Sequence, residues 1–273
     1  MKTLNMKLKL LLAAFAALAA CNASAGLITQ WTVGVNTIFD TTTVVPIPGV
    51  TVVNNQTLRW GTSTGSGQSG LNITDSPSSA TVFTDGAAVA NVSITHLNRP
   101  VTGTSLSSVD ILSTLTLTPL VPALPGLPSA TITFGVNFAE TPNGDNPCAG
   151  GGANGVGVNI NGCADVFVID QNALNFGFMY DTDGIGGDDP VQYYISFFEL
   201  TSGLNPLPSV ACGAAGSTAP CLGFRTPEGA DTTFQFASLI TTERVSVPEP
   251  GILSLMGLGL AGMVFASRRR KQA

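Results

Sequence analysis

Basic residues are scarce in this chain, and most of them lie at its two ends. Of 273 residues, 11 are basic and 17 are acidic. The stretch from residue 26 to residue 246 contains only Arg59, Arg99, Arg225 and Arg244 against 16 acidic residues, which gives it a formal charge of −12. So few cations cannot neutralise the phosphates of a nucleic acid, and we exclude nucleic acid as a partner.

Histidine is almost absent as well. His96 is the only histidine, and the cysteines are not spaced as C-x-x-C, which disfavours a zinc site. We expect no G-x-S-x-G elbow or other local signature among the many serines and aspartates that would single out a nucleophile and an acid for His96 to work with. We therefore expect a protein that is not an enzyme.

Amphipathic helix patterns are missing too, and strand periodicity takes their place. Trp31, Val33 and Val35 alternate with polar or small residues, and the same alternation runs through 132–138. Further β-rich runs, most of them bounded by Gly, Pro, Asn or Asp, occupy residues 50–53, 71–74, 80–84, 88–97, 109–118, 166–170, 174–180, 191–200, 232–237 and 240–247. The pattern predicts an all-β fold, an antiparallel β-sandwich or jelly-roll-like single domain over residues 26–246.

The C-terminus has three elements in a fixed order: Val247, Pro248, Glu249 and Pro250, then an apolar run over 251–266, then four basic residues at 268–271. The run has 16 residues, fewer than the roughly 20 that span a bilayer as a helix. The basic residues would remain cytoplasmic, which places the rest of the chain across the inner membrane. Residues 247–273 resemble the PEP-CTERM sorting signal of Gram-negative bacteria. The resemblance implies transient membrane attachment by a short helix and removal of the signal by an exosortase.

The N-terminus has the pattern of a secretory signal peptide. Lys2, Lys7 and Lys9 precede an apolar run over 10–20, and an A-x-A cleavage site ends at Ala25. We predict that residues 1–25 are removed. The alternative is a lipoprotein box that ends at Cys21, with that cysteine acylated. We prefer cleavage after Ala25, because a chain with a C-terminal sorting signal needs no second anchor.

Four cysteines remain in the exported part: Cys148, Cys163, Cys212 and Cys221. An even number of cysteines in an exported chain favours disulfides. Three pairings are open, and we favour the two local ones, Cys148 with Cys163 and Cys212 with Cys221, since each closes a short loop of small residues.

The segment Thr95-His96-Leu97-Asn98 resembles the signature of the THxN family of PEP-CTERM proteins, and residues 58–61 and 71–73 resemble the preceding part of the same domain. The family implies an exported domain without an assigned activity. His96 and Asn98 share a strand face with the apolar Val92 and Ile94, so the favoured interpretation is an internal hydrogen-bond network. The alternative is a pair that contacts a ligand at the sandwich rim.

An acidic, glycine-rich loop contains Asp181, Asp183, Asp188 and Asp189. These carboxylates could supply oxygen ligands to calcium, although the EF-hand spacing is absent. A solvated turn is the simpler interpretation, so we expect no cofactor, with calcium at this loop as the alternative.

Two classes of function fit these features. We favour a surface or matrix protein with a structural or adhesive role in the envelope, biofilm or exopolysaccharide. The alternative is a carbohydrate-binding module or an extracellular matrix hydrolase. A binding module would expose several rings on one face, whereas a structural domain would bury them; the candidate rings are Trp31, Trp60, Tyr180, Tyr193 and Tyr194.

Overall fold

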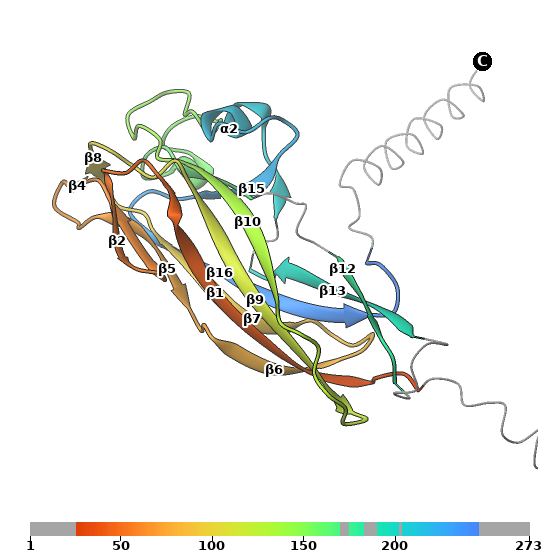
Figure 1. Ribbon diagram of the computed structural model, residues 1–273. Coiled ribbons are helices and arrows are strands. Elements are labelled where there is room, and N and C mark those ends of the chain that lie inside the picture. The colour runs from red at the N-terminus through yellow and green to blue at the C-terminus, as the bar shows by residue number, and fades with distance from the viewer. Residues whose placement is uncertain (1–25, 170–174, 183–189, 202–203, 246–273) are drawn as a thin grey trace, which may run out of the picture.

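Two antiparallel β-sheets make up most of the computed structural model, which describes residues 26–169, 175–182, 190–201 and 204–245 (Figure 1). Strands make up 54% of the described chain, which contains almost no helix. All of the pairings between these strands are antiparallel, which confirms the predicted all-β class. The predicted signal peptide and the C-terminal apolar segment lie outside the described residues.

Each large sheet has seven strands. In spatial order, the first sheet contains β14 (Asn205–Pro206), β15 (Leu222–Thr226), β11 (Asp165–Ile169), β10 (Ala130–Ala139), β9 (Ser108–Val121), β1 (Gln30–Val45) and β6 (Ser78–Phe83). The second sheet contains β12 (Phe176–Tyr180), β13 (Val191–Glu199), β16 (Asp231–Thr241), β7 (Val89–Leu97), β5 (Ser69–Thr74), β3 (Thr57–Trp60) and β2 (Val50–Asn54). A small separate pair joins β4 (Thr62–Ser63) to β8 (Val101–Thr102).

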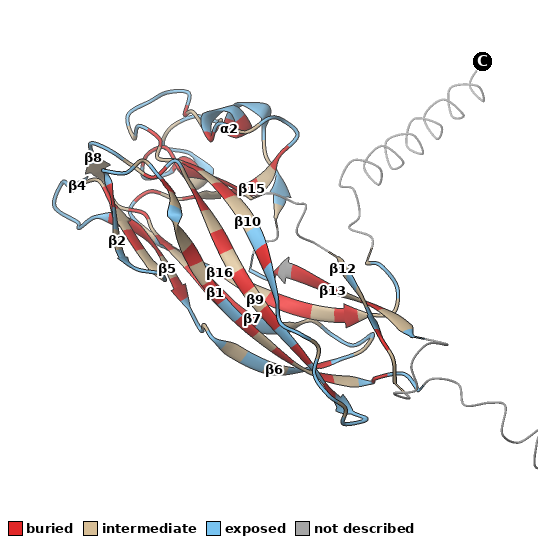
Figure 2. Cartoon of the chain, viewed as in Figure 1, coloured by how far each residue is buried: buried red, intermediate tan, exposed pale blue. Residues whose placement is uncertain are grey.

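The two sheets share one apolar interior. Trp31, Val33 and Val35 are buried at alternate positions of β1, as the sequence alternation predicts. Phe224 of the first sheet stacks on Phe234 of the second, with ring centroids 3.7 Å apart. Buried positions recur along the long strands of both sheets (Figure 2). Packing of the two sheets on this core therefore sets where the strand ends lie relative to one another.

One predicted pair of strands is wrong in detail. The runs over 232–237 and 240–247 form a single strand, β16, which ends at Thr241. A register shift between Gln235 and Ala237 lets the strand continue along β7. Neither glycine nor proline lies between the two runs, so nothing in the backbone forces a break.

Two short helices interrupt the β pattern, η1 (Gly157–Asn159) and α2 (Ser209–Ala214). The second begins directly after Pro208, and Cys212 lies within it. Six residues are too few to show a helical period in the sequence, which explains why the pattern did not predict this helix.

Candidate functional site

Several strand ends meet at one end of the two-sheet body and bring polar side chains together. β7 carries His96 near its end, and Asn98 follows the strand. β3 ends at Trp60 and β15 ends at Thr226. β11 begins with Asp165. Residues 140 and 228 follow β10 and β15, so strands far apart in sequence supply one cluster.

His96 lies entirely inside this cluster. Its side chain is 0% exposed, and Nδ1 shares a hydrogen bond of 2.9 Å with the Thr226 hydroxyl. Its ring stacks against Trp60 and meets Phe138 and Phe167 edge-on. Burial among these rings, with a smaller contribution from the positive charge of Arg99, lowers the pKa of His96 to about 3. The imidazole is therefore neutral at physiological pH.

Asn98 is also fully buried, and its amide donates to the carbonyl oxygen of Thr226 at 3.1 Å. His96 and Asn98 thus both bind Thr226 and tie the end of β7 to the end of β15 across the core. Thr95, the first residue of the Thr-His-Leu-Asn segment, points away from His96 and Asn98. Its hydroxyl shares a hydrogen bond with the Thr233 hydroxyl on the neighbouring strand.

Three carboxylates complete the cluster. One oxygen of Glu140 accepts a hydrogen bond from the Trp60 indole N–H at 2.8 Å. Oδ1 of Asp165 accepts one from the backbone N–H of Thr141 at 2.8 Å. Glu228 is 2% exposed. Oxygens of these three side chains lie within 4.8 Å of one another.

Several polar atoms here have no hydrogen-bond partner among the described residues: His96 Nε2, Asn98 Oδ1, Asp165 Oδ2 and both carboxylate oxygens of Glu228. His96 Nε2 lies 3.9 Å from Asp165 Oδ2, which is too far for a hydrogen bond. The Asn143 side chain and the Gly229 N–H lie near enough to Glu228 to offset part of the rise in its pKa, but without good hydrogen-bond geometry. Buried polar atoms are normally satisfied, so this concentration is unusual.

The carboxylates resist ionisation in this setting. Burial raises the pKa of Glu140 to about 7, with Glu228 adding to the rise and the Trp60 hydrogen bond opposing it. Burial, together with the neighbouring charge of Glu140, raises the pKa of Asp165 well above its usual value. Burial also raises the pKa of Glu228. Each shift has the sign expected for acids confined together away from water.

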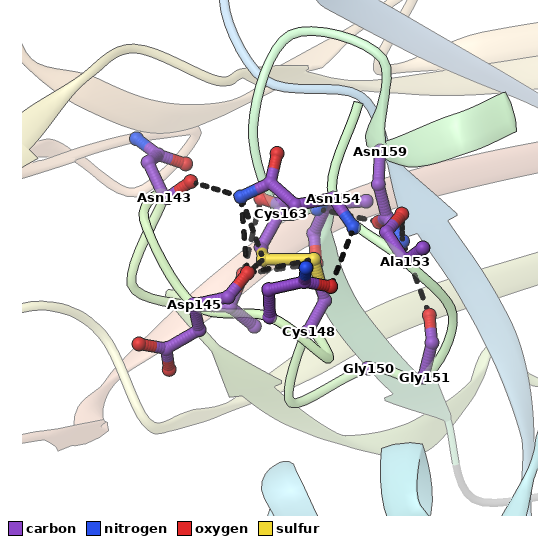
Figure 3. Close-up of a disulfide and its surroundings, with 12 residues drawn as sticks. Asn143, Asp145, Cys148, Gly150, Gly151, Ala153, Asn154, Asn159 and Cys163 are labelled. Atoms are coloured by element: carbon purple, nitrogen blue, oxygen red, sulfur yellow. Dashed lines mark hydrogen bonds between the residues drawn. A yellow bond between two sulfur atoms is a disulfide. The ribbon is translucent and has the colours of Figure 1, made fainter. Parts of the chain in front are cut away.

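A loop closed by a disulfide lies directly before Asp165 in the chain. Cys148 and Cys163 are bonded, and the Asn154 amide donates to the carbonyl oxygens of Asn143 and Asp145 beside them (Figure 3). The hydroxyl of Thr141 donates to the Cys163 carbonyl at 3.0 Å, two residues before Asp165. The predicted local pairing is present here, and also between Cys212 and Cys221.

Other predicted site residues lie elsewhere. The sorting residues Val247, Pro248, Glu249 and Pro250 fall outside the described part of the chain, and so do Asp183, Asp188 and Asp189 of the proposed calcium loop. Asp181 is described, but it lies at the edge of that gap and not in the buried cluster.

Residues 61–65, Gly-Thr-Ser-Thr-Gly, do fit G-x-S-x-G, which corrects the expectation that no such signature exists. Ser63, however, lies in the short strand β4, and its hydroxyl accepts hydrogen bonds from the N–H groups of Gly65 and Gly67. A nucleophile elbow instead joins a strand to a helix, so the match has no catalytic geometry.

Sequence reasoning also missed Glu140, Asp165 and Glu228. They lie 25 and 63 positions apart, and each stands alone between apolar or small neighbours. The sequence feature that could have drawn attention to them is an acidic residue at the boundary of a β-rich run, as at Asp165 before the run that begins at Val166. This feature does not reveal which strands are neighbours in the sheet.

Comparison with protein families gives one result. Residues 246–271 match the model of the PEP-CTERM protein-sorting motif. The chain carries a PEP-CTERM sorting signal. No curated protein matches the chain in sequence.

The PEP-CTERM match confirms the predicted sorting signal and defines the route of the protein. It implies an exported substrate of an exosortase, sorted to the cell envelope of a Gram-negative bacterium. Disulfides suit that route, because they persist in oxidising compartments outside the cytoplasm. Within the described residues, no helix has the length and apolar character needed to cross a bilayer.

Proposed function

We propose that this PEP-CTERM protein has a structural or adhesive role, without catalysis, at the cell surface or in the extracellular matrix, with the exopolysaccharide as its partner. We also assign its exported domain to the THxN group, on the residues 95–98. The observation that carries the proposal is the sorting signal at 246–271, which implies delivery of the rest of the chain to the envelope.

The burial of the aromatic rings supports a structural role over sugar recognition. Trp31, Trp60 and Tyr193 are 0% exposed and Tyr180 is 9% exposed. Three of these rings pack on one another, with Tyr180 and Tyr193 edge-on to Trp31. Rings engaged in this way are not available for a sugar to stack on. The fifth candidate, Tyr194, is half-buried, and the Arg244 guanidinium lies over its ring.

The setting of His96 supports a role without catalysis. A general base must reach a substrate proton within hydrogen-bond distance or through one water molecule. His96 is 0% exposed, sits between aromatic rings and has a pKa of about 3. In this position the imidazole packs in the core and is out of reach of a substrate.

The sorting signal can be tested by changing its motif. Replacing Pro248, Glu249 and Pro250 with alanine removes the rigid, exposed segment that a processing enzyme could recognise. We expect the unprocessed chain to accumulate in the inner membrane, detected by fractionation and by the mass of its C-terminus. Replacing Glu243, an exposed acid upstream, with alanine serves as the control and should leave processing normal. Normal release of the triple variant would contradict the proposal.

The role at the surface needs a separate measurement. A strain that lacks the protein should lose adhesion or matrix cohesion, and both should return with the wild-type gene and with a His96→Phe variant that folds. Retention of the protein by the strain's purified exopolysaccharide would identify the partner. Exopolysaccharide cleavage by the purified protein would overturn the non-catalytic assignment.

A further inference from the structure

We propose that Glu140, Asp165 and Glu228 bind a divalent cation of the calcium type in the buried cluster at the ends of β10, β11 and β15. This site differs from the acidic loop at 181–189 and is independent of the proposed surface role. It would hold together the three connections that leave these strands.

The distances fit a single ion. One oxygen from each of the three carboxylates lies within 4.8 Å of the others. An ion that binds oxygen at about 2.3–2.6 Å can bridge oxygens up to roughly 5 Å apart, as Ca²⁺ does. The smaller Mg²⁺ prefers about 2.0–2.1 Å and strict octahedral geometry, which suits these separations less well.

The unsatisfied atoms point to the same place. Asp165 is 0% exposed, and its Oδ2 has no hydrogen-bond partner, although Thr141 fixes Oδ1. Trp60 holds one oxygen of Glu140 in the same way. In metal sites, such contacts to the outer oxygen orient a carboxylate and leave the other oxygen for the ion. Asn98 Oδ1 is also buried and without a hydrogen-bond partner among the described residues.

The three carboxylates outnumber the positive charge that the described chain places near them. The described residues include no lysine, and Arg99 is the arginine whose charge lowers the pKa of Glu228, although it also pairs with Asp231. The other three arginines have partners elsewhere: Arg59 binds Asn72, Arg225 binds the Gly150 and Gly151 carbonyls, and Arg244 lies over Tyr194. His96 is neutral. A buried group of three acids is therefore stabilised either by protons or by a metal ion.

The chemistry of the ligands selects the class of ion. Carboxylate and amide oxygens suit Ca²⁺, Mg²⁺ and Mn²⁺, whereas imidazole suits Zn²⁺ and other transition metals. His96 Nε2 faces Asp165 but is not among the three groups that lie mutually close. We assign His96 to the apolar wall of the site, beside Asp165, and not to the ligands.

The site can be tested by melting the purified full chain in a chelator and after addition of Ca²⁺. At a free ion concentration about 100 times Kd, a one-site ligand should raise Tm by roughly 5–10 °C in a protein of this size. Equilibrium dialysis should give one tightly bound Ca²⁺ for each chain. Asp165→Asn and Glu228→Gln should lose both effects, whereas Asp145→Asn, which removes an exposed carboxylate next to the disulfide loop, should retain them.

Variants that simply misfold can be recognised by their Tm in the chelator, compared with that of the wild-type protein. Removing a buried carboxylate relieves repulsion, so Asp165→Asn and Glu228→Gln should melt no lower than wild type in the chelator. A lower Tm there, with an unchanged response to Ca²⁺, would assign the carboxylates a purely structural role and overturn the proposal.

Trp60 supplies a spectroscopic signature. Its indole N–H touches Glu140, so Tb³⁺, used as a luminescent substitute for Ca²⁺, should be sensitised by light that excites tryptophan. Trp60→Phe should abolish the sensitised emission and reduce the Tm gain from Tb³⁺, because Glu140 loses the contact that orients it, whereas Trp31→Phe, on the other side of the core, should leave both intact. No emission and no Tm gain in wild type would overturn the site. A larger response to Zn²⁺ that depends on His96 would overturn the assignment to oxygen ligands.

Discussion

Glu140 is the residue whose ionisation should control the stability of the metal-free protein near neutral pH. Its pKa is about 7 in the folded state against 4.5 as the unperturbed value. A raised pKa means that folding favours the protonated acid, so the stabilisation is complete below about pH 4.5 and is lost as pH rises through about 7. In a chelator, the free energy of unfolding should therefore fall between pH 6 and pH 8, by at most about 1.4 kcal/mol per pH unit for each proton involved.

A glutamine at position 140 provides the comparison, since its side-chain oxygen can still accept the hydrogen bond from Trp60. The Glu140→Gln variant should have a shallower dependence on pH, measured by urea unfolding across the same range. Asp165 and Glu228 still titrate in the variant and leave part of the slope. His96 acts in the opposite sense at lower pH, because its pKa falls on folding, and it affects both proteins equally. Identical slopes for the two proteins would refute the role given to Glu140.

At the scale of elements, the loop closed by Cys148 and Cys163 should control both stability and the geometry of the cluster. The bonded cysteines are 15 positions apart, and a loop of that length contributes about 3 kcal/mol in the chain-entropy model. Replacing both cysteines with serine should lower the free energy of unfolding by roughly 2–4 kcal/mol. It should also reduce the Tm gain on adding Ca²⁺, because Cys163 lies two residues before Asp165 and binds Thr141 through its carbonyl.

The second disulfide is the matched control for this prediction. Cys212 and Cys221 close a shorter loop around α2 and pack against β11, but they hold none of the three carboxylates. Replacing this pair with serine should lower stability and leave the Tm gain from Ca²⁺ unchanged. An equal loss of the gain in both double variants would show that the effect is global and not specific to the loop.

The elements were largely predictable from the sequence, whereas their neighbours in space were not. Alternation located β1 and β10 because each has one buried face, and it placed His96 on the apolar face of β7. The acids of the cluster depend instead on the order β15, β11, β10 within one sheet. That order depends on contacts between strands far apart in the sequence, including a close approach of paired β15 and β11 at Gly223, where a Cβ would clash with the Phe167 carbonyl. No local pattern records such a contact.

At the scale of the whole molecule, the described fold and the sorting signal occupy separate parts of the chain. The last strand, β16, ends at Thr241, and the backbone N–H of Thr242 then donates to Asp85. Every described strand of both sheets lies within residues 26–245. The sorting match begins at residue 246, so the described strands all come from the part of the chain that precedes the signal.

This separation predicts the behaviour of a chain that ends at residue 245. Every strand pairing and both disulfides of the described fold remain available to it. We expect its Tm to lie within about 2 °C of that of the processed wild-type protein, since surface changes away from the core usually alter stability by no more than about 0.5 kcal/mol. Fractionation should find it released and not held at the inner membrane, because it lacks the apolar run. A much lower Tm or aggregation would show that residues beyond 245 stabilise the fold, and that sorting and folding depend on the same segment.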